Sequence, residues 1–143
     1  MTPETRAYAR WHLRLGWWAL AGWLVLGLTL EGLHGLKVGW YLDPGAETRR
    51  LLWTLAHAHG ALLGLVHVAF GATVLALPGA GWGRLESRCL TAGALLLPLG
   101  FLLGGVVIHG GDPGLPVLLV PPGAMCLAVG VVATARRVSR AGV

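Results

Sequence analysis

The sequence predicts an all-α integral membrane protein, an up-down bundle of four helices that occupies residues 1–143 as a single transmembrane domain. Hydrophobic residues make up 55% of the chain and charged residues only 12%, whereas soluble domains carry roughly 25% charge. Four apolar stretches are also long enough to cross a bilayer, which takes about 20 residues in a helix. This composition excludes a typical soluble enzyme, a disordered chain and a secreted disulfide scaffold.

The four apolar stretches predict membrane spans at about residues 15–40, 50–77, 88–109 and 115–136. Short segments rich in Gly and Pro separate them, and these residues favour turns because Pro fixes φ and Gly leaves it free. Connections this short make consecutive spans antiparallel neighbours, as in an up-down bundle. The first stretch has the length of a span and continues into further membrane sequence, so we expect it to be retained rather than cleaved as a signal peptide.

Positive charge predicts the orientation of the spans. Eight arginines fall on the side that carries both termini, and three basic residues fall on the other side. The positive-inside rule therefore places both termini in the cytoplasm, and we expect the protein in the inner membrane of a bacterium, surrounded by the lipid bilayer. The arginines form no stripe interleaved with aromatic residues, so nucleic acid is not an expected partner.

Ionisable side chains within membrane spans are costly and mark candidate functional sites. Glu31 and His34 are three residues apart, so both project from one helix face near the outer end of the first span. They either form an interfacial ion pair, with Lys37 as another partner for Glu31, or handle protons or polarise a substrate. His109 ends the third span, and Asp112 follows it. We take Glu31, His34 and His109 as candidate catalytic residues of a site in the outer half of the bundle.

The second span carries the most informative histidines. His57 and His59 lie about 200° apart around a helix, so one is expected to face the bundle interior and the other a neighbouring subunit. Gly60 and Gly64 continue a stripe of small residues on this span. Such a stripe either lets helices approach closely or makes room for a flat cofactor. Neutral imidazole is a common metal ligand, and haem iron accepts a single axial His, so these four residues form a candidate cofactor site.

The remaining histidines and the cysteines carry weaker predictions. His67 lies deeper in the second span, towards the cytoplasmic side, and its role is left open. His12 lies in the basic N-terminal flank and is expected at the surface. Cys89 and Cys126 are isolated within apolar segments, so they are expected to be small buried side chains rather than a disulfide or a metal site.

The second span also resembles a known family. Residues 53–64 read Trp-Thr-Leu-Ala-His-Ala-His-Gly-Ala-Leu-Leu-Gly, which resembles the second helix of styrene oxide isomerases and of the related hydroxylaminobenzene mutase-like membrane proteins. Their pattern is an Ala-His followed, seven residues after the His, by the Gly of an Asn-Gly pair. Here Ala56 and His57 match the Ala-His, and Gly64 matches the Gly. The layout of four spans, with a Gly/Pro-rich third connection and prolines in the fourth span, is also similar.

The resemblance implies a cofactor, a chemistry and an assembly. Styrene oxide isomerases are homotrimers that hold haem b between subunits, and the His of the motif is the axial ligand. Their ferric iron acts as a Lewis acid on the epoxide oxygen. By resemblance, His57 is the metal ligand here, the cofactor is haem b, and the protein is a trimeric isomerase that rearranges a small hydrophobic substrate, an epoxide or a related compound.

Two departures from the family indicate a different substrate pocket. The Asn that precedes the motif Gly is Leu63 here, and the family's Tyr in the third span is replaced by the stretch Gly-Gly-Val at 104–106. Three other functions stay open on the sequence. The first is a haem or tetrapyrrole subunit for electron transfer or pigment binding. The second is a membrane protein with a non-haem metal or proton-coupled site at Glu31, His34, His109 and Asp112. The third is a structural subunit.

Overall fold

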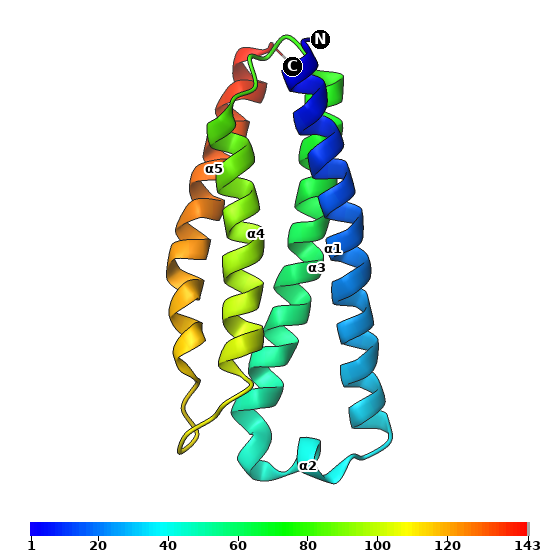
Figure 1. Ribbon diagram of the computed structural model, residues 1–143, viewed down its shortest axis with the longest axis vertical. Helices are drawn as coiled ribbons and strands as arrows, with labels where there is room; N and C mark the ends of the chain where they lie inside the picture. Colours follow the sequence, from blue (N-terminus) through cyan, green and yellow to red (C-terminus); the bar gives the residue numbers. More distant parts are fainter. Residues whose placement is uncertain (143) are drawn as a thin grey trace.

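The computed structural model describes residues 1–142 and consists of helices joined by short connections (Figure 1). In chain order the elements are α1 (Pro3–Gly35), α2 (Gly39–Leu42), the 3-10 turn η1 (Pro44–Ala46), α3 (Glu47–Ala76), α4 (Arg84–Gly104), the 3-10 turn η2 (Leu115–Leu119) and α5 (Val120–Arg140). Four helical segments are long and apolar enough to cross a membrane. The predicted class, a membrane protein built as a four-helix bundle, is confirmed.

The helices begin and end at residues other than the predicted span ends. The first helix begins at Pro3 rather than near residue 15, because the Thr2 hydroxyl accepts the Thr5 N–H and Pro3 occupies the first turn, where its missing N–H costs nothing. The helix of the third predicted span, α4, ends at Gly104, five residues before the predicted end at 109. A second glycine, Gly105, follows directly. The basic N-terminal flank is therefore part of α1.

The C-terminus of α1 is closed by a left-handed residue. The Val38 N–H donates to the Leu33 carbonyl at 3.0 Å, and the Lys37 N–H donates to the His34 carbonyl at 3.1 Å. Lys37 has φ +51°, the conformation that Gly normally provides in this motif. The first helix therefore stops at Gly35 instead of continuing to residue 40.

Replacing Lys37 by Gly is expected to raise the free energy of unfolding by about 1 kcal/mol, because a Cβ at positive φ is strained and Gly has none. The change is measured by denaturation of the detergent-solubilised protein in SDS. Lys37→Ala removes the charge but keeps the Cβ, so it is the control and is expected to leave stability near that of the parent. An equal gain in both variants would assign the effect to charge instead.

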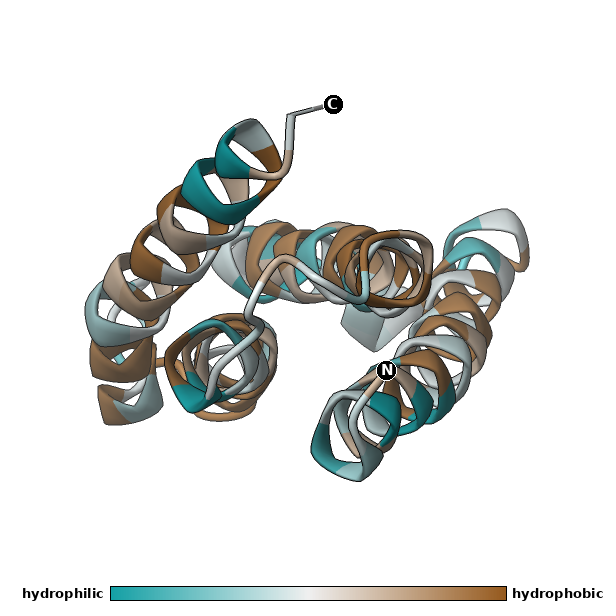
Figure 2. Cartoon of the chain, turned by 90° about the horizontal axis from the view of Figure 1, so that it is seen from above, coloured by the Kyte–Doolittle hydropathy of each residue, from teal (hydrophilic) through white to brown (hydrophobic). Residues whose placement is uncertain are grey.

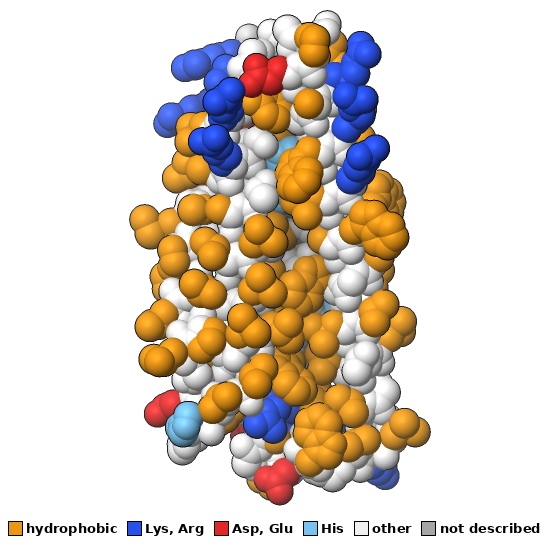
Figure 3. All heavy atoms as spheres, viewed as in Figure 1, with side chains coloured by type: hydrophobic (Ala, Val, Ile, Leu, Met, Phe, Trp, Pro, Cys, Tyr) orange, Lys and Arg blue, Asp and Glu red, His pale blue; other side chains and the backbone are white. Residues whose placement is uncertain are grey.

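The four long helices pack in chain order. α1 packs on α3, α3 on α4 and α4 on α5 (Figures 1 and 2), as short connections predict. Both termini lie at the same end of the molecule. Basic side chains gather at that end, and a broad hydrophobic band covers the middle (Figure 3). The charge asymmetry read from the sequence is therefore an asymmetry of the folded bundle.

A hydrophobic core cluster lies near the end that carries the termini. Its buried hydrophobic residues are Ala9, Phe70, Val74, Trp82 and Leu90. In contrast, only 17% of the most apolar stretch of α1, and 11% of that of the segment Leu115–Arg140, is buried. Because these faces are apolar as well as exposed, they are suited to contact lipid or another copy of the chain.

Candidate functional site

His57 projects from α3 against α1. Its Nδ1 lies 2.7 Å from the carbonyl oxygen of Trp23, and a carbonyl can only accept, so Nδ1 carries the proton. In the neutral imidazole, Nε2 then presents a lone pair. Within residues 1–142, no protein group hydrogen-bonds to this nitrogen.

The position of the His57 ring depends on Gly27. This glycine lies one turn after Trp23 on α1, and the ring rests directly against it. A Cβ at Gly27 would lie 2.6 Å from Nδ1 and 2.8 Å from Nε2 of His57, which is closer than van der Waals contact allows. The imidazole therefore reaches the Trp23 carbonyl only because Gly27 has no side chain.

A cavity of about 260 Å³ lies between α1 and α3 beside His57. Glu31 and Thr54 provide its other polar side chains, and its remaining walls are Leu24, Gly27, Leu28 and Leu30. The structure thus brings two predicted site residues, His57 and Glu31, to one cavity. The alternative of an ion pair between Glu31 and His34 or Lys37 is not formed in the part of the chain that the structure describes.

His59 contacts a different neighbour. Its Nδ1 lies 2.8 Å from the carbonyl of Leu55 in its own helix, and its ring lies against Phe101 of α4 with centroids 5.2 Å apart. His57 and His59 therefore point to α1 and α4. The expected opposition of the two rings is present, and both rings contact helices of the same chain. The expected contact of one of them with a neighbouring subunit stays a prediction.

Gly60 and Gly64 lie in the contact between α3 and α1. The indole of Trp23 rests on Gly60, and a Cβ at Gly64 would lie 2.9 Å from the backbone nitrogen of Leu20. Close helix approach is therefore what these glycines do within one chain. Their predicted contact with a cofactor stays a prediction.

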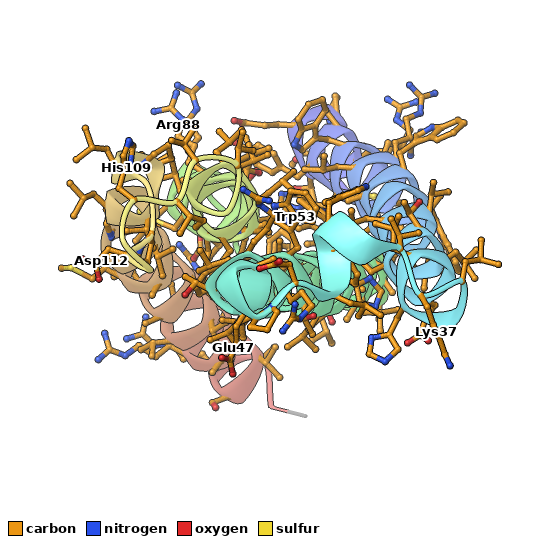
Figure 4. All side chains as sticks on the ribbon, turned by 90° about the horizontal axis from the view of Figure 1, so that it is seen from below. Lys37, Glu47, Trp53, Arg88, His109 and Asp112 are labelled. Carbon is orange, nitrogen blue, oxygen red and sulfur yellow. The ribbon has the colours of Figure 1, made fainter. Side chains whose placement is uncertain are left out.

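His34 and His109 lie apart from this cavity. Both are exposed, and the backbone of His109 pairs with that of Asp112 in the connection before η2, with N···O distances of 3.2 and 2.9 Å. Figure 4 shows His109 and Asp112 at one side of the bundle and Lys37, three residues after His34, at the opposite side. One chain therefore does not assemble Glu31, His34 and His109 into a single cluster, and their catalytic roles stay predictions.

The sequence did not predict a buried network of polar side chains at the end of the bundle that carries the termini. The expectation that His12 lies at the surface is wrong, because it is fully buried. Its Nδ1 lies 2.6 Å from Nδ1 of His67, and its Nε2 lies 2.9 Å from the hydroxyl of Ser87. A signal was present in the sequence, since Ala9, His12 and Gly16 share the α1 stripe that packs on α3.

A second buried polar pair lies nearby. Glu86, only 2% exposed, accepts a hydrogen bond from Nε of Arg137 on α5 at 2.7 Å. Its other carboxylate oxygen is buried and has no partner among residues 1–142. The pair joins the start of α4 to the end of α5.

The described residues 1–142 contain no group of three or more His, Cys, Asp or Glu side chains that could hold a metal ion. Comparisons with family models, with curated proteins and with solved structures find no match to this chain. The resemblance expected from the sequence motif around His57 therefore stays a prediction.

Proposed function

We propose that this protein binds haem b through His57 and isomerises a small hydrophobic substrate, an epoxide or a related compound, within the membrane. The observation that carries the proposal is the bond between Nδ1 of His57 and the Trp23 carbonyl. Histidines that ligate metals usually donate their second ring nitrogen to a carbonyl or carboxylate, which orients the ring and raises its basicity. His57 has this arrangement, with Nε2 left as the ligand atom.

The surroundings of His57 fit a tetrapyrrole in chemistry. The donor is a neutral imidazole nitrogen, and four of the seven residues that line the cavity are Leu or Gly. In one chain, the cavity between α1 and α3 is open on one side rather than a closed pocket. The exposed apolar face of α1, which includes Trp18 and Leu28, is suited to pack against a second copy, so we propose that the complete site lies between subunits of a homotrimer.

The chain's own residues would orient the substrate and exclude water. Bound ferric haem supplies a Lewis acid for a substrate oxygen. Leu24, Leu28 and Leu30 keep the cavity apolar, which strengthens any interaction with developing charge. The carboxylate of Glu31 is the charged group that shares this cavity with His57. It would fix the polar end of the substrate by accepting a hydrogen bond or a proton. With the termini in the cytoplasm, Glu31 would lie towards the side of the membrane that faces away from the cytoplasm.

The first experiment is the absorption spectrum of the purified protein after expression with added haem, oxidised and then reduced with dithionite. We expect a Soret band in the wild type and its loss in His57→Ala, because no other group replaces the iron ligand. His59→Ala, on the same helix, is the matched control and is expected to keep the band. Absence of a Soret band in the wild type would overturn the proposal, and a low-spin six-coordinate spectrum would favour an electron-transfer subunit instead.

Gly27→Ala keeps the His57 residue but is expected to lower haem content about tenfold. Loss of the group that orients a metal-ligating His has an effect of this size. The added methyl occupies the position of the imidazole, so the ring loses the Trp23 carbonyl and its orientation. Haem content is measured as the ratio of Soret to protein absorbance. Gly32→Ala on the same helix, where a Cβ meets no atom within 4 Å, is the control. Equal haem content in both variants would show that the orientation of His57 is not required.

A further inference from the structure

Ser87, His12 and His67 form a hydrogen-bonded chain at the end of the bundle opposite to the Glu31 cavity. The three side chains come from α4, α1 and α3. His12 and His67 are 0% and 1% exposed, and Ser87 is 8% exposed. Edge contact with Phe70, with centroids 4.6 Å apart, further confines the His12 ring. The arrangement is therefore fixed by three helices at once.

The carbonyl of Leu90 determines where the protons of this chain lie. Nε2 of His67 is 3.3 Å from that oxygen, and since a carbonyl only accepts, Nε2 carries a proton. Neutral His67 then accepts at Nδ1, so Nδ1 of His12 is the donor in the 2.6 Å contact. Nε2 of His12 is consequently a lone pair, and the hydroxyl of Ser87 donates to it at 2.9 Å.

This direction of hydrogen bonds is that of an activated serine. A nucleophilic Ser requires a base within about 2.6–3.2 Å, and the base requires a third group that holds its other nitrogen. Here His12 is the base, and His67 takes the orienting role that an Asp has in hydrolytic triads. His67 is itself oriented by Leu90, so it acts as a positioning residue.

A cavity gives access to Ser87 but not to the histidines. Its volume is about 310 Å³, and it is lined by Ser87, Arg84, Arg88, Tyr8 and Trp11 together with Ala7. Its two arginines come from the start of α4, at the end of the bundle that carries the termini. Glu4 lies 3.6 Å from Arg84, whereas Arg88 has no acidic partner among residues 1–142. The cavity therefore combines Ser87, an aromatic wall and positive charge.

We propose that Ser87 is a nucleophile for acyl transfer from an ester that carries a negatively charged group and an apolar tail. Oγ attacks the ester carbonyl carbon, and its proton moves to Nε2 of His12. The bond to the leaving alcohol breaks as the alcohol takes that proton. Water then attacks the acyl-serine, gives a proton to His12 and releases the acid, and Oγ regains its proton. Arg88 binds the negative group, and the apolar tail lies along the hydrophobic band.

The test uses an alkyl fluorophosphonate, which forms a bond from phosphorus to Oγ and loses fluoride as the serine proton passes to the base. The chain contains two serines, and the other, Ser139, is exposed on α5. We expect the wild-type protein in detergent to be labelled at Ser87 about 100-fold faster than at Ser139, as general-base assistance predicts. Peptide mass spectrometry of the folded wild type measures this ratio directly. Equal rates at the two serines would overturn the proposal.

Variants separate the roles of the three residues. Ser87→Ala abolishes the fast label and Ser139→Ala keeps it. His12→Gln lowers the labelling rate constant about 100-fold, and His67→Gln lowers it while leaving the half-saturating probe concentration unchanged. Fast labelling that persists in folded His12→Gln would contradict the assigned base.

A separate assay tests Arg88. It compares the hydrolysis rate of a p-nitrophenyl ester with a carboxylate tail with that of p-nitrophenyl butyrate. This ratio is expected to fall about tenfold in Arg88→Ala through loss of a charge-assisted hydrogen bond, and an unchanged ratio would remove the anionic group from the proposal.

Discussion

Gly16→Ala is expected to lower the free energy of unfolding by roughly 1–3 kcal/mol, as overpacking of a tight interface does. A Cβ at Gly16 would lie 2.7 Å from the Gly64 carbonyl oxygen and 2.7 Å from the Val68 backbone nitrogen on α3. These are backbone atoms, so no side-chain rotation relieves the contact and the helices must separate. Separation weakens the dispersion contacts that hold helices together in lipid, where the hydrophobic effect contributes little.

Gly22→Ala provides the matched control on the same helix, because a Cβ there meets no atom within 4 Å. Its stability is expected to stay within about 0.5 kcal/mol of the parent, as for other surface substitutions. SDS titration of the solubilised protein, followed by circular dichroism, measures both variants. Equal stability of the two variants would mean that α1 and α3 do not approach through Gly16.

Arg137→Ala is expected to destabilise the protein by about 3 kcal/mol, since it leaves the carboxylate of Glu86 buried without its cation. Glu86 is 2% exposed, and its second oxygen already lacks a partner within residues 1–142. The side chain of Arg137 is 36% exposed, which places the expected loss at the lower end of the range for buried pairs. SDS titration again gives the free energy of unfolding.

Two further variants identify the cause of that loss. Arg136→Ala removes an exposed neighbouring arginine and is expected to have little effect, because exposed charges contribute little to stability. Adding Glu86→Leu to Arg137→Ala is expected to restore most of the lost stability, since no charge is then left buried. Failure of the double variant to recover would show that Arg137 acts through packing of its stem rather than through the carboxylate.

The sequence alone was sufficient for the membrane class, the four helices and the end at which positive charge gathers. These properties depend on the length of apolar stretches, on Gly and Pro between them and on the positions of arginines, all of which are local. The motif around His57 was also visible in one helix. No sequence pattern could show that Glu31 shares a cavity with His57, because that proximity depends on the rotation of α1 against α3.

Tertiary structure decided which polar groups meet. His12 and His67 are 55 residues apart in sequence, and His12 and Ser87 are 75 apart, so no local pattern joins them. In a chain with 23 glycines, several faces of each helix are smooth enough to pack, and hydrophobicity does not select among them in lipid. Close backbone contacts at Gly16 and Gly64 select one register. That register buries His12 against His67 and brings Ser87 into line with both.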